Sequence, residues 1–420
     1  DLLDLPARES ARAQHSLQLA VSRAGERLVA VGERGIVLLS DDAGRSWHQA
    51  RSVPVSVALT DVHFASASHG WAVGHSGVVL HSSDGGESWT RQLDGKQAAL
   101  IIRDDAKRRA DAGEEGAAAA LRSAEFLVTD GPDKPFLGVR FADEQRGYAV
   151  GAYGIALYTT DGGQHWQSLV GQIPNPRGKH LYQVQIAGDA LLIAGEQGAL
   201  FRSVDAGAHF AAVQTPYAGT FFGALELGGD ALLAYGLRGN AWRSADGGAS
   251  WQRVELGQEN TVNAALSLGD GALLLADESG RLLHSVDGGQ SFTTLPAAAA
   301  TSITSLLQTH DGALVLAGTR GLVRVEPAAL AEPTALAELF NNRLVIVCLC
   351  LFVTLVLGYQ ALGLSLNAAF EKMIPTSHPY IANFLENRKQ LAGMGNTLRI
   401  AVEAKDGSIF DDEYLDTVRK

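Results

Sequence analysis

Six aspartates recur in one eight-residue pattern, Ser/Thr-x-Asp-x-Gly-x-x-Trp/Phe, and their regular spacing makes them the first candidates for chemistry. They are Asp42, Asp84, Asp161, Asp205, Asp246 and Asp287. A carboxylate held in place can serve as an acid, a base or a cation ligand. It can also accept hydrogen bonds from the amides of its own turn. Because a single active site has no use for six copies, we interpret these aspartates as structural residues of turns.

Cations and aromatic residues recur in a different setting, in Gly-x-x-Gly turns and in two connections that contain Pro and Gly. The turns GERG, GHSG, GAYG, GLRG and GTRG supply Arg34, His75, Tyr153, Arg238 and Arg320, and the connections PNPRGKH and TPYAGTF supply Arg177, Lys179, His180 and Tyr217. Side chains of these types form charge-assisted and stacking contacts with other molecules. They are our candidates for binding a partner.

The spacing of the Asp pattern defines the elements that hold both groups. Successive copies start 42, 77, 44, 41 and 41 residues apart, so one unit repeats with a single insertion. Asp-Gly and Gly-Gly pairs between apolar runs form tight hairpins, and the aromatic residue that follows packs between sheets. Seven turns of the Gly-x-x-Gly kind accompany six Asp patterns, which predicts an all-β, seven-bladed β-propeller over residues 1–327.

The two ends of the repeat region predict how the ring closes. The seventh unit, LVLAGTRGLVRVEP, lacks the Asp pattern and stops after its third strand. The segment LLDLP, with Leu2, Leu3 and Leu5, precedes the first unit. We expect it to supply the outer strand that the seventh blade lacks.

Strand order assigns the two groups of residues to opposite faces. In a four-stranded antiparallel blade, the first-to-second and third-to-fourth turns share one face, while the second-to-third turns share the other with the crossovers between blades. The Asp patterns occupy third-to-fourth turns. The candidate binding residues therefore gather on the opposite face, either as an ordinary solvated rim or as a basic surface for a protein partner.

The insertion at residues 96–131 is Ala-rich and has helical periodicity. Ala99, Ile102, Ala106 and Ala110 form one stripe, and Leu121, Ala124 and Phe126 follow later. Gly113 and Gly116 divide it into two expected helices. The hairpin either caps a blade or docks a helix of a partner.

The repeated pattern resembles the Asp-box of BNR-repeat proteins, and whole units resemble the photosystem II stability/assembly factor family. The likeness is carried by VHFASASHGWAVGHSGVVLHSSDGGESW and VRFADEQRGYAVGAYGIALYTTDGGQHW and covers about residues 10–327. It implies a non-catalytic scaffold linked to photosynthesis, because family members in photosynthetic organisms are lumenal chaperones of reaction-centre assembly. Many non-photosynthetic bacteria carry an exported relative, and the basic face of such proteins is thought to receive the client.

Composition restricts the partners. The chain of 420 residues has a net charge of −12, which disfavours nucleic acid as a ligand because phosphate binding needs clustered cations. The histidines are scattered singly, and His63, His75, His81, His165, His180 and His284 are interpreted as surface or turn residues. We expect no metal and no cofactor. The first residue is Asp1 rather than Met, so the chain is either processed or truncated. If it is processed, a removed signal peptide would place the propeller outside the cytoplasm.

An apolar run after a linker at 328–343 predicts a transmembrane helix at 344–364, where about twenty residues carry no charge. The segment 365–420 is expected to be a partial α/β fragment. Its FEKMIPTSHPY and NTLRIAVEA resemble the start of resistance-nodulation-division (RND) transporters, a likeness that spans about residues 334–420 and implies a transporter partner. The fragment lacks the later helices that carry a transporter's proton relay, so it is not expected to pump alone.

The two resemblances conflict in topology. The first helix of an RND transporter begins in the cytoplasm, whereas an exported propeller needs the opposite side, and one crossing does not satisfy both. The charges that flank the run do not decide the orientation. We expect a cell-membrane protein with a periplasmic propeller, and we leave open whether the two parts are a natural fusion.

The alternative function is that of a sialidase-like propeller that binds or hydrolyses glycans. Arg34, Arg238 and Arg320 could hold a carboxylate and Tyr153 could act as the nucleophile. The Arg-Ile-Pro motif of that family is absent from the sequence, as are a Gly-x-Ser-x-Gly elbow and a phosphate-binding Gly loop. We therefore expect no enzyme activity and no catalytic residue.

Overall fold

The computed structural model describes residues 2–298, 301–327, 343–362 and 379–386. The chain divides into two compact units, Asp1–Thr334 and Ala335–Lys420. Each unit is described by itself. The first unit contains all the candidate residues introduced above.

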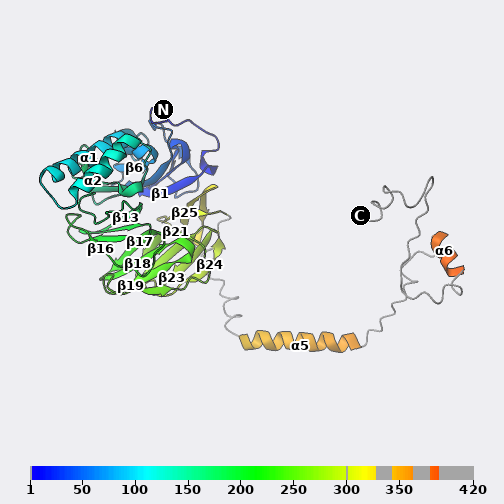
Figure 1. Ribbon diagram of the computed structural model, residues 1–420. Coiled ribbons are helices and arrows are strands. Elements are labelled where there is room, and N and C mark those ends of the chain that lie inside the picture. The colour runs from blue at the N-terminus through cyan, green and yellow to red at the C-terminus, as the bar shows by residue number, and fades with distance from the viewer. Residues whose placement is uncertain (1, 299–300, 328–342, 363–378, 387–420) are drawn as a thin grey trace, which may run out of the picture. The chain divides into compact units, whose positions relative to one another are not determined.

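Seven antiparallel sheets make up the first unit, and consecutive strands are neighbours in each (Figure 1). The first three blades are β1 (Gln18–Ala24), β2 (Arg27–Gly32), β3 (Val37–Ser40) and β4 (His48–Gln49); β5 (Leu59–Phe64), β6 (Gly70–Gly74), β7 (Val79–Ser82) and β8 (Thr90–Leu93); and β9 (Phe136–Phe141), β10 (Gly147–Gly151), β11 (Ala156–Thr159) and β12 (Gln167–Ser168). The next two are β13 (Leu181–Ala187), β14 (Ala190–Gly195), β15 (Leu200–Ser203) and β16 (Ala211–Ala212); and β17 (Phe221–Gly228), β18 (Ala231–Gly236), β19 (Ala241–Ser244) and β20 (Gln252–Val254). The last two are β21 (Val262–Gly269), β22 (Ala272–Asp277), β23 (Arg281–Ser285) and β24 (Thr293–Ala298); and β25 (Ile303–Gln308), β26 (Leu314–Gly318) and β27 (Gly321–Val325).

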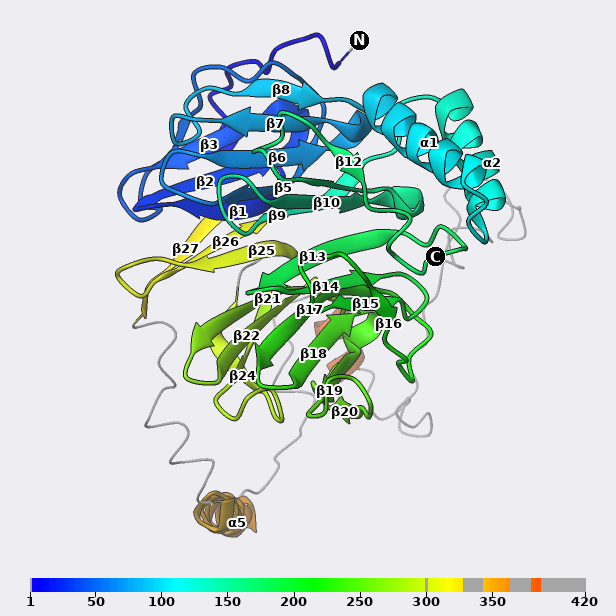
Figure 2. The same ribbon diagram turned by 90° about the vertical axis from the view of Figure 1, so that its left-hand side faces the viewer.

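The first strands of the blades form the inner wall of a closed ring. Each first strand contacts the first strand of the next blade, and β25 contacts β1. Figure 2 shows the last sheet, β25–β27 in yellow, beside the first sheet in blue. The prediction of a seven-bladed propeller is confirmed.

Apolar packing between blades explains why the repeat closes into a ring. The second strands β6 and β10 are buried along their whole length. Trp71 of β6 is fully buried and stacks on Phe141 of the next blade, with ring centroids 3.5 Å apart and planes 7° from parallel. Its indole Nε1 donates to the carbonyl of Gly162 at 3.3 Å. A single aromatic residue thus joins two blades by packing and by a hydrogen bond.

Polar side chains on the inner strands add a second link between neighbouring blades. Asp61 and His63 of β5 accept hydrogen bonds from the amides of Val139 and Phe141 at 2.9 and 3.2 Å. Gln183 of β13 accepts from the amide of Ala224 at 2.8 Å. These bonds satisfy backbone groups that no strand of the same sheet pairs with, so the polar residues hold the ring together.

The N-terminal segment does not complete the seventh blade. That blade has three strands in the described residues. Leu3 instead packs with Val53 and Val55 at the connection between the first two blades, and the amide of Ser56 donates to the carbonyl of Leu2 at 2.8 Å. The expectation of an outer strand from LLDLP is therefore wrong, because a larger apolar cluster at this connection buries Leu3.

The insertion forms the two helices that its glycines predict. Helix α1 (Gly95–Asp111) begins with a capping box in which Asp94 accepts from the amides of Lys96 and Gln97. It buries Ala98, Ile102 and Ala106 in a cluster that also contains Trp166 of the third blade. Helix α2 (Ala117–Asp130) packs on α1. The side chain of Phe126 on α2 is 70% exposed.

In the second unit the structure describes two helices, α5 (Arg343–Leu362) and α6 (Pro379–Glu386). Helix α5 covers most of the apolar run. No helix in the described residues has the length and apolar character needed to cross a bilayer, so the predicted transmembrane helix at 344–364 is not confirmed. Residues 328–342 of the linker and the segment NTLRIAVEA, with most of 365–420, lie outside the described residues.

Candidate partner-binding face

The six Asp-boxes share one arrangement of hydrogen bonds. The Ser or Thr hydroxyl that begins each box donates to Oδ1 of the aspartate at 2.7–2.9 Å and accepts from the amide of the glycine four residues on. The same Oδ1 accepts from the amide of the seventh residue at 2.8–3.0 Å, and Oδ2 accepts from the side chain of that residue at 2.5–2.7 Å. Both carboxylate oxygens are therefore engaged within the turn.

These bonds keep the carboxylates ionised. The pKa of Asp42 is lowered to about 2, chiefly by the hydrogen bond from the Ser46 hydroxyl. The pKa of Asp205 is lowered to about 2 by the amide of His209, and that of Asp246 to about 2 by the hydroxyl of Ser250. A carboxylate with a low pKa is a poor proton donor at neutral pH. The box carboxylates therefore stabilise their own turns, which is the structural role that six copies of the pattern indicated.

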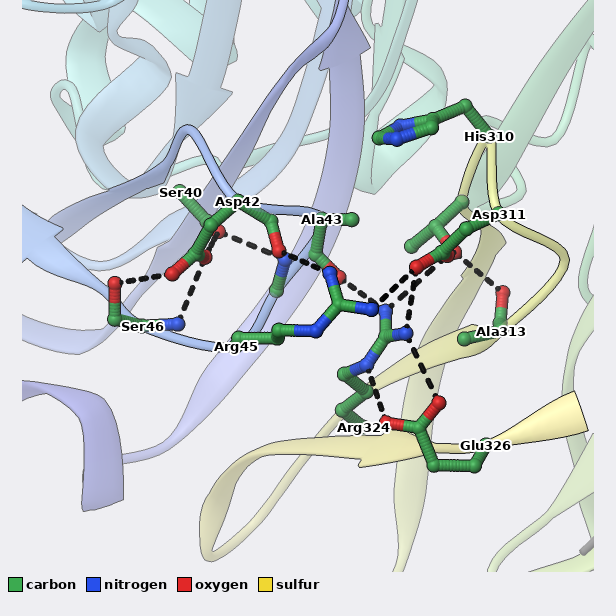
Figure 3. Close-up of polar contacts among 12 residues, drawn as sticks. Ser40, Asp42, Ala43, Arg45, Ser46, His310, Asp311, Ala313, Arg324 and Glu326 are labelled. Carbon is green, nitrogen blue, oxygen red and sulfur yellow. Dashed lines mark hydrogen bonds and ion pairs between the residues drawn. The ribbon is translucent and has the colours of Figure 1, made fainter.

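The face that carries the Asp-boxes also closes the ring (Figure 3). Asp311, in the β25–β26 turn, receives Arg45 of the first box at 2.7 Å and Arg324 of β27 at 2.8 Å. Arg324 is nearly buried, and its NH1 also donates to the carbonyl of Ala43 at 2.5 Å. Arg45 thus joins the first blade to the last through the Asp311 carboxylate, and Arg324 joins the last blade to the first through the Ala43 carbonyl.

The Gly-x-x-Gly turns lie at the other ends of the blades, between the second and third strands. Together with the crossovers they form what we call the GxxG face. In all seven turns an amide donates to a carbonyl just before the first strand of the same blade, at 2.9–3.2 Å. The third residue of five turns adopts a left-handed conformation, with φ between 54° and 58°, in Arg34, Ser76, Tyr153, Gln197 and Arg238. The backbone is therefore fixed while the exposed side chain differs from blade to blade.

Tyr153 and His180 come together on the GxxG face. Their ring centroids lie 4.9 Å apart. Nζ of Lys134 lies 5.5 Å from the centroid of Tyr153, although Asp133 and Asp130 partly neutralise this lysine. Tyr153 is 60% exposed. The three residues form an aromatic and cationic cluster open to solvent on one side.

Arg177, Lys179 and Tyr217 come together at the edge of one groove. The groove has a volume of about 380 Å³ and lies between the crossovers on either side of the fourth blade. Nζ of Lys179 donates to the carbonyl of Gln197 at 3.1 Å, and the Tyr217 hydroxyl donates to the carbonyl of Leu237 at 3.1 Å. Added to Gly198, a Cβ would lie 2.0 Å from the carbonyl oxygen of Tyr217. Glycine is therefore required where the turn meets this crossover.

The remaining candidates Arg34, His75, Arg238 and Arg320 stand in separate blades. In the described part of the chain, no hydrogen bond, ion pair or ring contact joins any of them to another. Glutamates also occupy these turns, and Glu33, Glu196 and Glu278 accept from the amides of Leu17, His180 and Thr261. The face is therefore not uniformly basic. Two of its cations, Arg177 and Lys179, line one groove beside the fourth blade.

Sequence reasoning missed Lys134 on this face and misplaced His63, a residue of an inner strand. Lys134 was not selected, since it lies next to Asp133 in a connection without a motif. His63 was interpreted as a surface or turn residue, which is wrong: it lies in β5, where its pKa is lowered to about 3, chiefly by burial. Alternation of polar and apolar residues in LTDVHF is the signal that could have placed it on an inner strand. Across the described residues, no group of three or more His, Cys, Asp or Glu side chains is arranged to hold a metal ion.

The sequence profile of a family described as photosynthesis system II assembly factor YCF48 matches residues 45–103 and 125–218, less than half of the chain. No curated protein sequence matches. Among solved structures, YCF48 bound to a D1 peptide is 16% identical with a TM-score of 0.56, covering 76% of this chain and 98% of that one. YCF48 from Cyanidioschyzon merolae is 15% identical with a TM-score of 0.56, covering 75% and 97%. The GH74 xyloglucanase from Xanthomonas campestris is 14% identical with a TM-score of 0.54, covering 78% of this chain and 54% of the enzyme. At these identities the structures show a shared fold.

Proposed function

We propose that this protein is a non-catalytic propeller scaffold that binds a membrane protein through the GxxG face. The observation that carries the proposal is that polar side chains are engaged within the turns on one face and exposed on the other. The Asp-box carboxylates are engaged in their own turns, whereas the GxxG face presents exposed Tyr153, Arg177 and Arg238 on a fixed backbone. Such a face suits recognition rather than bond cleavage.

A membrane-protein partner is favoured by the comparisons. The matched profile belongs to an assembly-factor family, and YCF48 of similar fold is recorded with a peptide of D1. By analogy, we propose that this propeller helps to assemble or gate a membrane complex. We also propose that this complex is an RND-type transporter, that residues 344–364 anchor the chain in the membrane, and that the propeller is periplasmic. The residues that the family profile matches all lie in the propeller.

Capture of a membrane partner tests the proposed function. The full chain is tagged, extracted with detergent and recovered from its source membranes, and proteins that accompany it are identified. We expect a defined membrane protein to co-purify. Replacement of Arg177, Lys179 and Arg238 together by Glu should abolish this capture while the melting temperature stays close to that of the wild type, because Arg177 and Arg238 are exposed. Full capture by the triple variant at ordinary salt would remove this face from consideration.

The second candidate function is glycan hydrolysis, which we consider because a xyloglucanase shares the propeller fold. A glycosidase of the common type needs two carboxyl groups on either side of the scissile bond. Near Tyr153, Glu196 accepts from the His180 amide at 2.9 Å and is engaged in the turn. We therefore favour the scaffold.

A further inference from the structure

The groove beside the fourth blade has walls that are set before any ligand arrives. One wall is the crossover that contains Pro174, Pro176 and Arg177, and the other is the crossover that contains Thr215 and Pro216. Asn175 fixes the first crossover, since its side chain accepts from the amide of Lys179 at 3.0 Å and donates to the carbonyl of Lys179 at 2.9 Å. Thr215 fixes the second by donating to the carbonyl of Gly198 at 3.0 Å. A pre-formed groove loses little entropy on binding.

The charge of the groove opposes that of the whole chain. Arg177 and Lys179 line it, and none of its lining residues carries a carboxylate. The chain as a whole has a net charge of −12. Burial lowers the pKa of Lys179, and the nearby Arg177 lowers it further, while Glu196 opposes the shift. The groove is thus a local positive site on an acidic protein, suited to an anionic ligand.

An edge strand of a sheet also contributes to the lining of the groove. Ala212 and Val213 line it, and Ala212 belongs to β16, which is the outermost strand of the fourth blade in the described residues. Ala212 pairs with Phe201 of β15. The outer edge of a strand can accept an extended peptide through main-chain hydrogen bonds.

We infer that this groove binds an extended acidic segment of the partner protein, with peptide backbone along β16 and carboxylates toward Arg177 and Lys179. The inference rests on the proposed function and names the site and chemistry of the contact. The combination of a strand edge with two cations favours a peptide over a small anion, which would use the cations alone.

Binding of labelled peptides to the full chain tests the inference. The probe is a fluorescein-labelled Thr-Glu repeat of about eight residues, which spans about 26 Å when extended, and its partner probe is the matching Thr-Gln repeat. We expect fluorescence anisotropy to show binding of the acidic peptide that is about tenfold or more tighter than binding of the neutral one. Inorganic phosphate at equal concentration should not displace it. Equal binding of both peptides, no binding of either, or ready displacement by phosphate would overturn the inference.

Two matched pairs of variants locate the contact. Ala212→Trp should block the groove, whereas Ala211→Trp, also exposed but on the opposite face of the same short strand, should bind within about twofold of wild type. Arg177→Glu should weaken binding of the acidic peptide about tenfold or more, whereas Arg122→Glu, which changes an exposed cation of helix α2, should not. Equal effects within either pair would contradict the site. If Ala212→Trp still captures the membrane partner while the triple charge reversal does not, the proposed function stands and the groove is not the contact.

Discussion

Trp89 shows that the recurring aromatic residue of an Asp-box can act as a packing residue. It is 3% exposed, lies edge-on to Phe64 at 5.9 Å and donates from Nε1 to the carbonyl of Gly86 at 2.8 Å. Trp251 occupies the same place in another box and is only half-buried. The same pattern position therefore contributes unequally in different blades.

Trp89→Ala should lower the free energy of unfolding by about 3–5 kcal/mol, because it removes a buried aromatic ring and leaves a cavity. Trp251→Ala should cost less. Urea denaturation followed by circular dichroism measures both. A Trp89→Ala variant that keeps its stability and loses a ligand would mean that the box is a binding motif rather than a packing unit.

The box aspartates predict how stability depends on pH. The pKa values of Asp42, Asp205 and Asp246 are lowered from 3.8 to about 2. Since the folded protein binds these protons more weakly than the unfolded chain, the stabilisation is present above about pH 4 and is lost as the pH falls toward about 2. The urea midpoint should therefore be lower at pH 3 than at pH 6, and Asp42→Asn should reduce that difference. An unchanged midpoint between these two values would contradict the assignment.

At the scale of elements, local sequence signals predicted the structure well. Each hairpin is encoded by its own Asp, Gly and aromatic residues, so the blades and the two faces followed from the sequence. The position of Leu3 depends on Val53 and Val55, which are distant in the chain, and no local pattern encodes it. The same holds for the groove, since Arg177 and Tyr217 belong to crossovers about forty residues apart that only the folded blade brings together.

The junction of the first and last blades carries a testable ion pair. Arg324→Met keeps most of the apolar stem but removes the bonds to Asp311 and Ala43, and it should lower the free energy of unfolding by about 1–3 kcal/mol. The control is Arg253→Met, whose partner Glu255 is well exposed and whose loss should cost less than about 1 kcal/mol. Thermal denaturation of both compares them. Equal effects would mean that the junction does not depend on this pair.

At the scale of the whole molecule, scaffold and glycosidase make opposite predictions for turnover. We expect the purified protein to hydrolyse neither aryl sialosides nor xyloglucan, because the candidate arginines Arg34, Arg238 and Arg320 stand in separate blades and a sugar carboxylate must be held by groups within reach of one ring. Release of reducing ends or of the aryl group is the measurement. Turnover that is lost in the Tyr153→Phe variant would contradict the scaffold function and support the glycosidase function.

The left-handed third residue of the GxxG turns affects which amino-acid substitutions the propeller can accept. Arg34, Ser76, Tyr153, Gln197 and Arg238 share nearly the same φ, and each sits on a backbone held by bonds that involve no side chain of its own. A cation, a hydroxyl, a phenol and an amide are therefore interchangeable there without rebuilding the blade. Five of the seven turns therefore each offer one position that can be exchanged, so new specificity can arise by single substitutions while the backbone of the ring stays the same.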